Sequence, residues 1–342
     1  MPADGLLRAS AATAALVLLA GALHLSAPVS APVVCALLVV AVVWPLQAAL
    51  ERVLPAGLAL LVTLACCLAA AALLLGAVAW GLGRAAAWLV ANTDRLQLLY
   101  ERFAGWAEAH GLYTRGILRE SLDPGRLLRL AAEAGARLQG LASFTLVTLV
   151  FVALGLLEVR PMRDRLARLE RPELGRLLLE GSASLAAKLQ RYMAVRTLVS
   201  ALTGLAVAAV AALVGLELAA VWGVMAFALN YLPFIGPLVA TVLPTLLALV
   251  QFQDVAVTLV VLVGLNLVQI LLNSGLEPRL AGARLGLSPF LVLLAVFTGA
   301  LLWGVPGAFL GVPVLIAVAT FAAAHPEGRW LARLLGAEPE AR

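Results

Sequence analysis

The chain has 342 residues, of which 63% are hydrophobic and only 13% are charged, against roughly 25% charged in an ordinary soluble chain. Its mean hydropathy is +1.03. These values exclude a soluble globular protein and predict an all-α, polytopic membrane protein. The net charge of +5 comes from basic residues in loops between apolar runs, so it indicates membrane orientation and not nucleic-acid binding.

The first 83 residues (1–83) are predicted to form three membrane spans. They correspond to three apolar runs, at residues 11–25, 29–44 and 56–82. Pro28 separates the first run from the second, and the stretch from Pro45 to Pro55 separates the second from the third. We therefore expect each run to cross the bilayer, which needs about 20 apolar residues, as a helix of its own.

Residues 84–140 differ from the runs before them because charged side chains alternate with apolar ones. Trp88, Phe103 and Trp106 recur at helical spacing among acidic and basic residues, and Asp123-Pro124 is typical of a helix N-terminus. Amphipathic helices with such aromatic residues are expected on the membrane surface. The alternative is a small extramembrane helical domain that packs on itself.

Residues 141–158 are apolar again and predict a fourth span, which an Arg-rich loop and helix follow at residues 159–195. This stretch holds six arginines between Arg160 and Arg176, and basic loops of this kind remain in the cytoplasm. Counting back through four spans places the N-terminus in the cytoplasm and the amphipathic helices outside. The C-terminal tail, residues 324–342, is also expected in the cytoplasm.

Two segments in the second half, at residues 219–250 and 287–321, are each interrupted by glycine and proline. The residues of the two breaks include Asn230, Pro233, Gly236, Pro237, Gly304 and Gly307. Irregular backbone in a bilayer must be buried in protein or line a cavity, and transporters build substrate sites at broken helices. Residues 196–323 are therefore predicted to form a transport core. Each broken segment is a re-entrant hairpin, two full spans or one long kinked span, which gives about eight membrane-embedded segments in all.

A polar stripe lies between the two breaks. Its members fall on one helix face, with a proline and an arginine directly after them: Asn266, Gln269, Asn273, Glu277, Pro278 and Arg279. Polar groups in a membrane helix are costly unless they find partners, so the stripe either bonds neighbouring helices or lines a cavity. Four residues in register favour the cavity. Thr203, in contrast, is expected to bond back to its own helix.

No motif of an enzyme or of a bound cofactor occurs in the sequence. The histidines are isolated, HExxH and GxSxG are absent, and the glycine-rich tract at residues 299–311 lacks the Lys-Ser/Thr of a nucleotide loop. The three cysteines lie in apolar runs without a CxxC pair, so neither disulfides nor a metal site are expected. Few carboxylates lie inside the apolar runs, with Glu277 the best placed, which argues against strong ion coupling.

Three ordered stretches carry a family resemblance. The first is residues 189–204, with Leu-Gln-Arg-Tyr at its start and Arg-Thr at 196–197. The second is residues 222–244, with Asn-Tyr-Leu-Pro-Phe-Ile-Gly-Pro at 230–237. The third is residues 276–313, with Leu-Glu-Pro-Arg-Leu-Ala-Gly at its start and Gly-Val-Pro-Gly at 304–307. In these motifs the chain resembles the AI-2E family of membrane transporters, which includes autoinducer-2 exporters and PerM-like permeases.

The resemblance implies a bacterial inner-membrane transporter that exports a small polar solute, such as an autoinducer-2-like molecule, and that forms a homo-oligomer of unknown order. Its expected partners are that solute and the lipid bilayer, with no nucleic acid and no cofactor. Some members resemble sodium/proton exchangers instead, but many carry an acidic residue about where Leu272 stands here. A sodium (or lithium)/proton antiporter centred on Glu277 is the first alternative. A non-transporting membrane scaffold, whose surface helices recruit partners, is the second.

Overall fold

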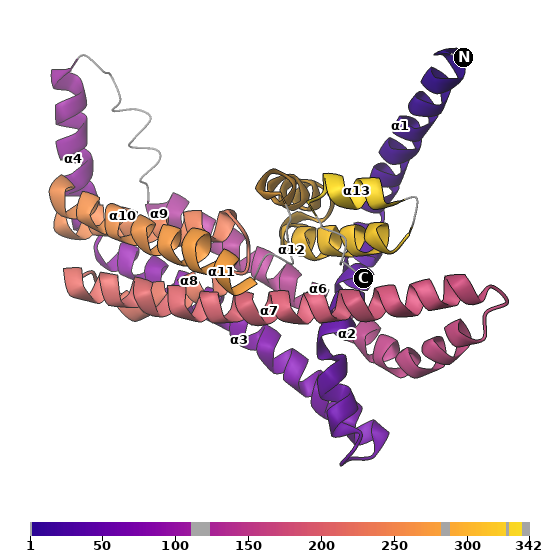
Figure 1. Ribbon diagram of the computed structural model, residues 1–342. Coiled ribbons are helices and arrows are strands. Elements are labelled where there is room, and N and C mark those ends of the chain that lie inside the picture. Colours follow the sequence, from indigo (N-terminus) through magenta and orange to yellow (C-terminus); the bar gives the residue numbers. More distant parts are fainter. Residues whose placement is uncertain (1, 111–123, 282–287, 326–327, 337–342) are drawn as a thin grey trace. The chain divides into compact units, whose positions relative to one another are not determined.

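The computed structural model describes residues 2–110, 124–281, 288–325 and 328–336, and every regular element within them is a helix (Figure 1). The helices are α1 (Pro2–Leu25), α2 (Ala27–Leu50), α3 (Ala56–Ala91), α4 (Thr93–Ala109), α6 (Pro124–Ala167), α7 (Pro172–Val214), α8 (Ala219–Leu229), α9 (Ile235–Phe252), α10 (Val255–Gln269), the π-helix η1 (Ile270–Leu276), α11 (Glu277–Ala281), α12 (Pro289–Ala324) and α13 (Arg329–Leu334). Seven candidate membrane spans are long and apolar enough to cross a bilayer: α2, α3, most of α6, α7, α9, the continuous α10–α11 segment and α12. The prediction of an all-α polytopic membrane protein is confirmed.

The chain divides into two compact units, each assembled from segments far apart in the sequence. The first unit comprises Met1–Leu68, Phe144–Met193 and Ala283–Arg342, and the second comprises Ala69–Ser143 and Ala194–Gly282. Helices α3, α6 and α7 each contribute to both units. Hydrophobic burial within each unit, and not the order of segments along the chain, therefore defines its core.

The first unit holds together α2, the start of α3 and the second part of α6. Ala36, Val152 and Leu156 form its small apolar core. Beside that core, the buried Thr63 hydroxyl donates to Gln47 Oε1 at 2.7 Å, so a polar contact between α2 and α3 is satisfied inside the protein. Such pairing is what makes polar side chains tolerable at membrane depth.

In this unit, α12 turns back on itself to form a helical hairpin. Gly304 has φ +65° and ψ −142°, outside the helical region. A β-carbon at Gly299 would lie 2.1 Å from Gly307 O, and one at Gly311 would lie 2.5 Å from Ala295 O, so the two arms touch backbone to backbone. The second predicted break is therefore a hairpin, and its glycines are required by close packing of the arms.

The second unit contains the first predicted break, which also forms a hairpin. Gln251, near the end of α9, accepts a hydrogen bond from Glu217 N at 2.8 Å and donates one to Gly215 O at 2.9 Å. These bonds join the residues just before α8 to the end of α9, so the two helices run antiparallel. At about 1.5 Å per residue, the 11 residues of α8 are too short to cross a hydrocarbon core of about 30 Å.

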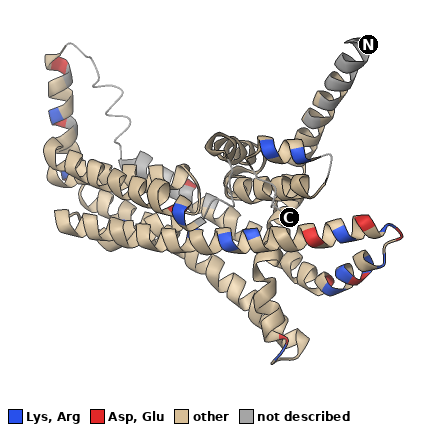
Figure 2. Cartoon of the chain, viewed as in Figure 1, with Lys and Arg blue, Asp and Glu red and all other residues tan. Residues whose placement is uncertain are grey.

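Charged residues are concentrated in a few segments, among them α4 and the first half of α7 (Figure 2). Figure 2 shows them gathered where α6 ends and α7 begins, and it shows α9 and α10 free of charge. The basic stretch at residues 160–176 is mostly helical, because α6 continues to Ala167 and α7 begins at Pro172. Within residues 84–140, α3 continues to Ala91 before α4 begins. Helix α6 begins at Pro124, and the predicted capping residue Asp123 lies outside the described residues.

Candidate functional site

Helix α7 presents a polar face inside the second unit. Arg196, Ser200 and Thr203 are spaced by four and three residues, which places them on one side of the helix. All three are buried, and Arg196 is only 5% exposed. The next positions on this side, Val207 and Ala211, belong to the apolar core of the unit. This side of α7 is therefore polar at first and apolar toward its C-terminal end.

The break between α8 and α9 packs on the polar part of α7. Asn230 is 1% exposed, and its Nδ2 donates a hydrogen bond to Ser200 Oγ at 3.1 Å. The hydroxyl of Tyr231 donates to Thr197 Oγ1 at 2.9 Å. Two side chains of the break are thus held by two hydroxyls of α7.

The break is a tight turn that only glycine allows at one position. A β-carbon at Gly236 would lie 1.9 Å from Leu229 O, closer than any real contact. The amide of Gly236 donates to Leu232 O at 2.9 Å, and that of Ile235 donates to Pro233 O at 2.7 Å. The turn therefore pairs these amides within itself and leaves the side chain of Asn230 available for other contacts.

Glu277 forms an ion pair with the buried arginine of α7. Arg196 Nη1 lies 2.6 Å from Glu277 Oε2, and the side chains are 5% and 20% exposed. Glu277 is the first residue of α11 and directly follows the π-helix η1, an irregularity that occurs frequently at functional sites. Because the two charges cancel, the pair brings no net charge into the unit.

The polar stripe that the sequence predicts is divided in the structure. Gln269 is buried, and Asn273 Nδ2 donates to Gln269 Oε1 at 2.7 Å. Glu277 follows four residues after Asn273. Asn266 is exposed, and its amide donates to Leu262 O at 2.8 Å, so it bonds back to its own helix and lies apart from the other three.

Five buried polar atoms along these contacts have no hydrogen-bond partner among the described residues: Arg196 Nε, Thr203 Oγ1, Asn230 Oδ1, Gln269 Nε2 and Asn273 Oδ1. Buried polar atoms are nearly always paired, and an unpaired one costs about 1–3 kcal/mol. The prediction that Thr203 bonds to its own helix is wrong, because its hydroxyl has no partner there. The five atoms include both donors and acceptors, which suits water or a polar solute that also donates and accepts.

The remaining predicted residues lie elsewhere. Pro278 and Arg279 are exposed on α11. Pro237 lies in the first turn of α9. Gly304 and Gly307 shape the α12 hairpin of the first unit, as described above.

Arg196, Thr197 and Ser200 are absent from the set of site residues predicted from the sequence. A signal for them exists, because with Thr203 they form a polar face at helical spacing within an otherwise apolar stretch. The rule that selects the stripe on α10 and α11 would have selected this face as well.

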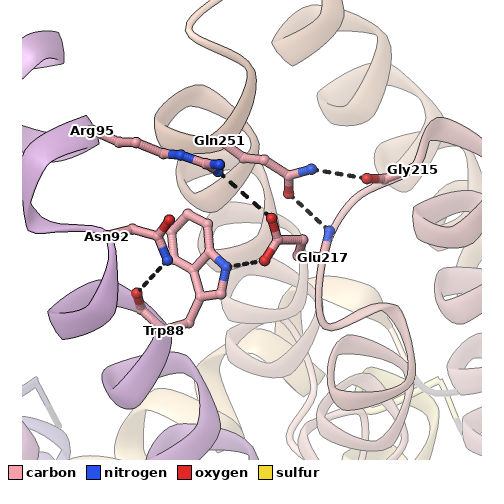
Figure 3. A network of polar contacts seen from close by, with 6 residues as sticks. All are labelled: Trp88, Asn92, Arg95, Gly215, Glu217 and Gln251. Carbon is pink, nitrogen blue, oxygen red and sulfur yellow. Dashed lines mark hydrogen bonds and ion pairs between the residues drawn. The ribbon is translucent and has the colours of Figure 1, made fainter.

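A second polar network lies just beyond the C-terminal end of α7 and is drawn in Figure 3. Trp88 Nε1 and Arg95 both contact the carboxylate of Glu217, the latter at 3.6 Å. The side chain of Gln251 accepts from Glu217 N and donates to Gly215 O, in the loop that carries this carboxylate. These contacts tie the end of α3 to the α7–α8 loop, so the network stabilises the fold.

Membrane helices, two glycine-dependent hairpins and a buried polar site together define a polytopic membrane transporter. The chain belongs to the AI-2E transporter family, because the model of the AI-2E family transporter matches residues 13–327.

Individual relatives are similar over part of their length. The AI-2 transport protein TqsA of Escherichia coli (strain K12) is 31% identical over 202 residues, which are 59% of this chain and 58% of TqsA. A putative transport protein of Borreliella burgdorferi is 33% identical over 37% of this chain and 36% of its own length. A putative transport protein of Haemophilus influenzae is 24% identical over 65% and 64%. The chain thus spans less than two thirds of each of these relatives.

Proposed function

We propose that this transporter moves a small, neutral, polar solute, of the class of autoinducer-2-like signalling molecules, out across the bacterial inner membrane. The observation that carries the proposal is the set of five unpaired buried polar atoms beside a charge-compensated ion pair. Hydroxyl groups of a solute can donate to an acceptor such as Asn230 Oδ1 or accept from a donor such as Gln269 Nε2, and such a bond would relieve the cost of leaving that atom unpaired. The name of TqsA, which is an AI-2 transport protein, supports the same solute class.

The proposed pathway begins at the polar face of α7 and the break at Asn230. It includes the other residues of that break and the Gln269–Glu277 stripe. On this proposal residues 196–323 form the transport core, and both termini are cytoplasmic, as the Arg-rich stretch at residues 159–195 indicates. A homo-oligomer is part of the proposal, with its order left to measurement.

Thr203→Val tests the proposal because valine has nearly the shape of threonine but no hydroxyl. Removing a hydroxyl that has no partner does not weaken the fold, so we expect a folded protein with at least tenfold slower solute movement. Thr258→Val is the matched control: Thr258 is also buried, but its hydroxyl bonds to Asp254 O at 2.7 Å within its own helix. That variant should transport like the parent.

The assay is efflux of AI-2, with erythritol as a neutral polyol for comparison, from proteoliposomes that contain the full chain. Equal efflux from the parent and Thr203→Val would contradict the proposed site. No efflux above that of empty liposomes from the parent would contradict the solute class.

An antiporter centred on Glu277 is less well supported, because that carboxylate is already paired with Arg196 at 2.6 Å. A pH change that depends on sodium or lithium, followed by dye quenching in everted vesicles, would support it. The scaffold alternative predicts a different result in cells. Deletion of residues 84–140 would remove the cellular phenotype that the protein confers, and substitutions at the two breaks would leave that phenotype intact.

A further inference from the structure

Helix α4 lies across one end of the second unit. Figure 1 shows it running steeply across the direction of α10, at the end where α9 meets α10. Two hydrogen bonds hold it to that turn: Gln253 Nε2 donates to Arg95 O at 2.9 Å, and Arg102 Nη1 donates to Gln253 O at 3.5 Å. Because α9 and α10 are both candidate membrane spans, the turn between them lies at one surface of the bilayer. Helix α4 therefore lies in the plane of that surface.

One face of α4 is apolar along its whole length. Leu96, Leu99, Phe103 and Trp106 are spaced by three and four residues, so they share a face. Leu96 is buried in the apolar core of the unit, and Leu99 packs against that core. The apolar face of α4 is thus directed toward the membrane-spanning helices.

The second half of this face extends beyond the core. Phe103 and Trp106 are 48% and 54% exposed, although they point to the same side as Leu96. Their rings lie 5.8 Å apart, and the ring of His110 lies 4.6 Å from that of Trp106. An exposed aromatic cluster on the membrane-directed side of a surface helix is unfavourable in water.

Helix α10, which begins just after the turn that α4 contacts, carries exposed apolar residues. Val255, Leu259 and Val263, which follow the turn along α10, are 66%, 52% and 63% exposed. On a membrane-spanning helix such residues contact acyl chains. The aromatic cluster lies on the helix that contacts the α9–α10 turn, at the level where the helices leave the bilayer. Tryptophan is preferred there because one end of its ring is apolar and the other polar.

We propose that α4 is an interfacial anchor, and that Phe103 and Trp106 insert into the boundary between lipid headgroups and acyl chains. The opposite face, with Gln97, Glu101 and Glu108, faces water. The partner is the bilayer itself. The proposal does not depend on the transported solute.

The test uses the full chain in phosphatidylcholine nanodiscs, with its three cysteines replaced by alanine. Single cysteines at Phe103 or Trp106 are labelled with the fluorophore NBD, and single cysteines at Gln97 or Glu101 serve as controls on the polar face. A monodisperse size-exclusion peak selects folded variants. Quenching is measured with lipids that carry a nitroxide near the headgroup or at acyl carbon 5, and with aqueous iodide.

We expect lipid nitroxides to quench the labels at 103 and 106 at least threefold more than those at 97 and 101, and iodide to show the reverse order. Equal iodide quenching at all four positions would place α4 in water and overturn the proposal. Protection of positions 103 and 106 from both iodide and lipid nitroxides would also overturn it, because protein would then cover the aromatic cluster.

Discussion

Removing one partner of the Arg196–Glu277 ion pair should destabilise the protein more than removing both. Glu277→Leu leaves the guanidinium of Arg196, which is 5% exposed, without its carboxylate. Breaking a buried pair in this way costs about 3–5 kcal/mol. Arg196→Met leaves a carboxylate that is 20% exposed and can be partly hydrated, so we expect a smaller cost of about 2–3 kcal/mol. The double variant should lie within about 1 kcal/mol of the parent, because apolar residues replace both charges.

The assay is reversible unfolding in mixed micelles of dodecyl maltoside and sodium dodecyl sulfate, followed by far-ultraviolet circular dichroism. The free energies of unfolding of the parent, the two single variants and the double variant form a double-mutant cycle. We expect a coupling energy of at least about 3 kcal/mol, because the sum of the single costs is about 5–8 kcal/mol. Additive single costs would show that the pair is not formed and would refute the reasoning.

Two further predictions concern the fold. Gly307→Ala should destabilise the first unit by at least about 2 kcal/mol, because the new β-carbon would lie 1.9 Å from Gly299 O. Gly76→Ala, which has open space on the part of α3 that belongs to the second unit, should instead stabilise that helix by up to about 1 kcal/mol. Thermal unfolding midpoints that fall equally for the two variants would contradict this. Asp254→Ala should lower the free energy of unfolding by about 0.5–2 kcal/mol, because Asp254 Oδ1 accepts from Ala256 N at 2.7 Å at the start of α10. Asp254→Asn should restore most of the lost stability in the same measurement.

The helical membrane fold follows from the sequence because composition and run length determine it almost alone. The positions of both breaks are predicted as well, since glycine and proline interrupt the apolar runs at 233–237 and 304–307. The hairpin form of the breaks is not predictable in this way. It depends on contacts such as Gly299 against Gly307, and on the bonds of Gln251 to the α7–α8 loop, which only the folded chain brings together.

The site is predicted in part, for a similar reason. Periodicity finds Gln269, Asn273 and Glu277 because they repeat on one face of one helix. It also selects Asn266, because it cannot show that this amide bonds back to Leu262 O. Arg196 is missed as a site residue, since its partner Glu277 is 81 residues away in the chain.

Helix lengths place the polar site in one half of the membrane. The α7–α8 loop and the end of α9 lie together at one end of the second unit, since Gln251 bonds to both Gly215 and Glu217. Asn230 bonds to Ser200, which lies 15 residues before Gly215 on α7. At about 1.5 Å per residue, Asn230 is therefore about 22 Å from that end, past the middle of a hydrocarbon core of about 30 Å. Arg196 lies further along α7 from the same end, toward the opposite surface.

Between Asn230 and that end, the second unit has an apolar core. Val207, Ala211, Val261 and Leu265 are fully buried there and make up part of its apolar core, in which water finds no polar partner. On the proposed function, a solute within the second unit would therefore reach Asn230 from the side of Arg196 and Glu277, and would stop at the apolar core. On the same proposal, passage through this unit requires its apolar core to separate, as it would in alternating access between the two sides of the membrane. A permanently open pore through the described part of the second unit is incompatible with such packing.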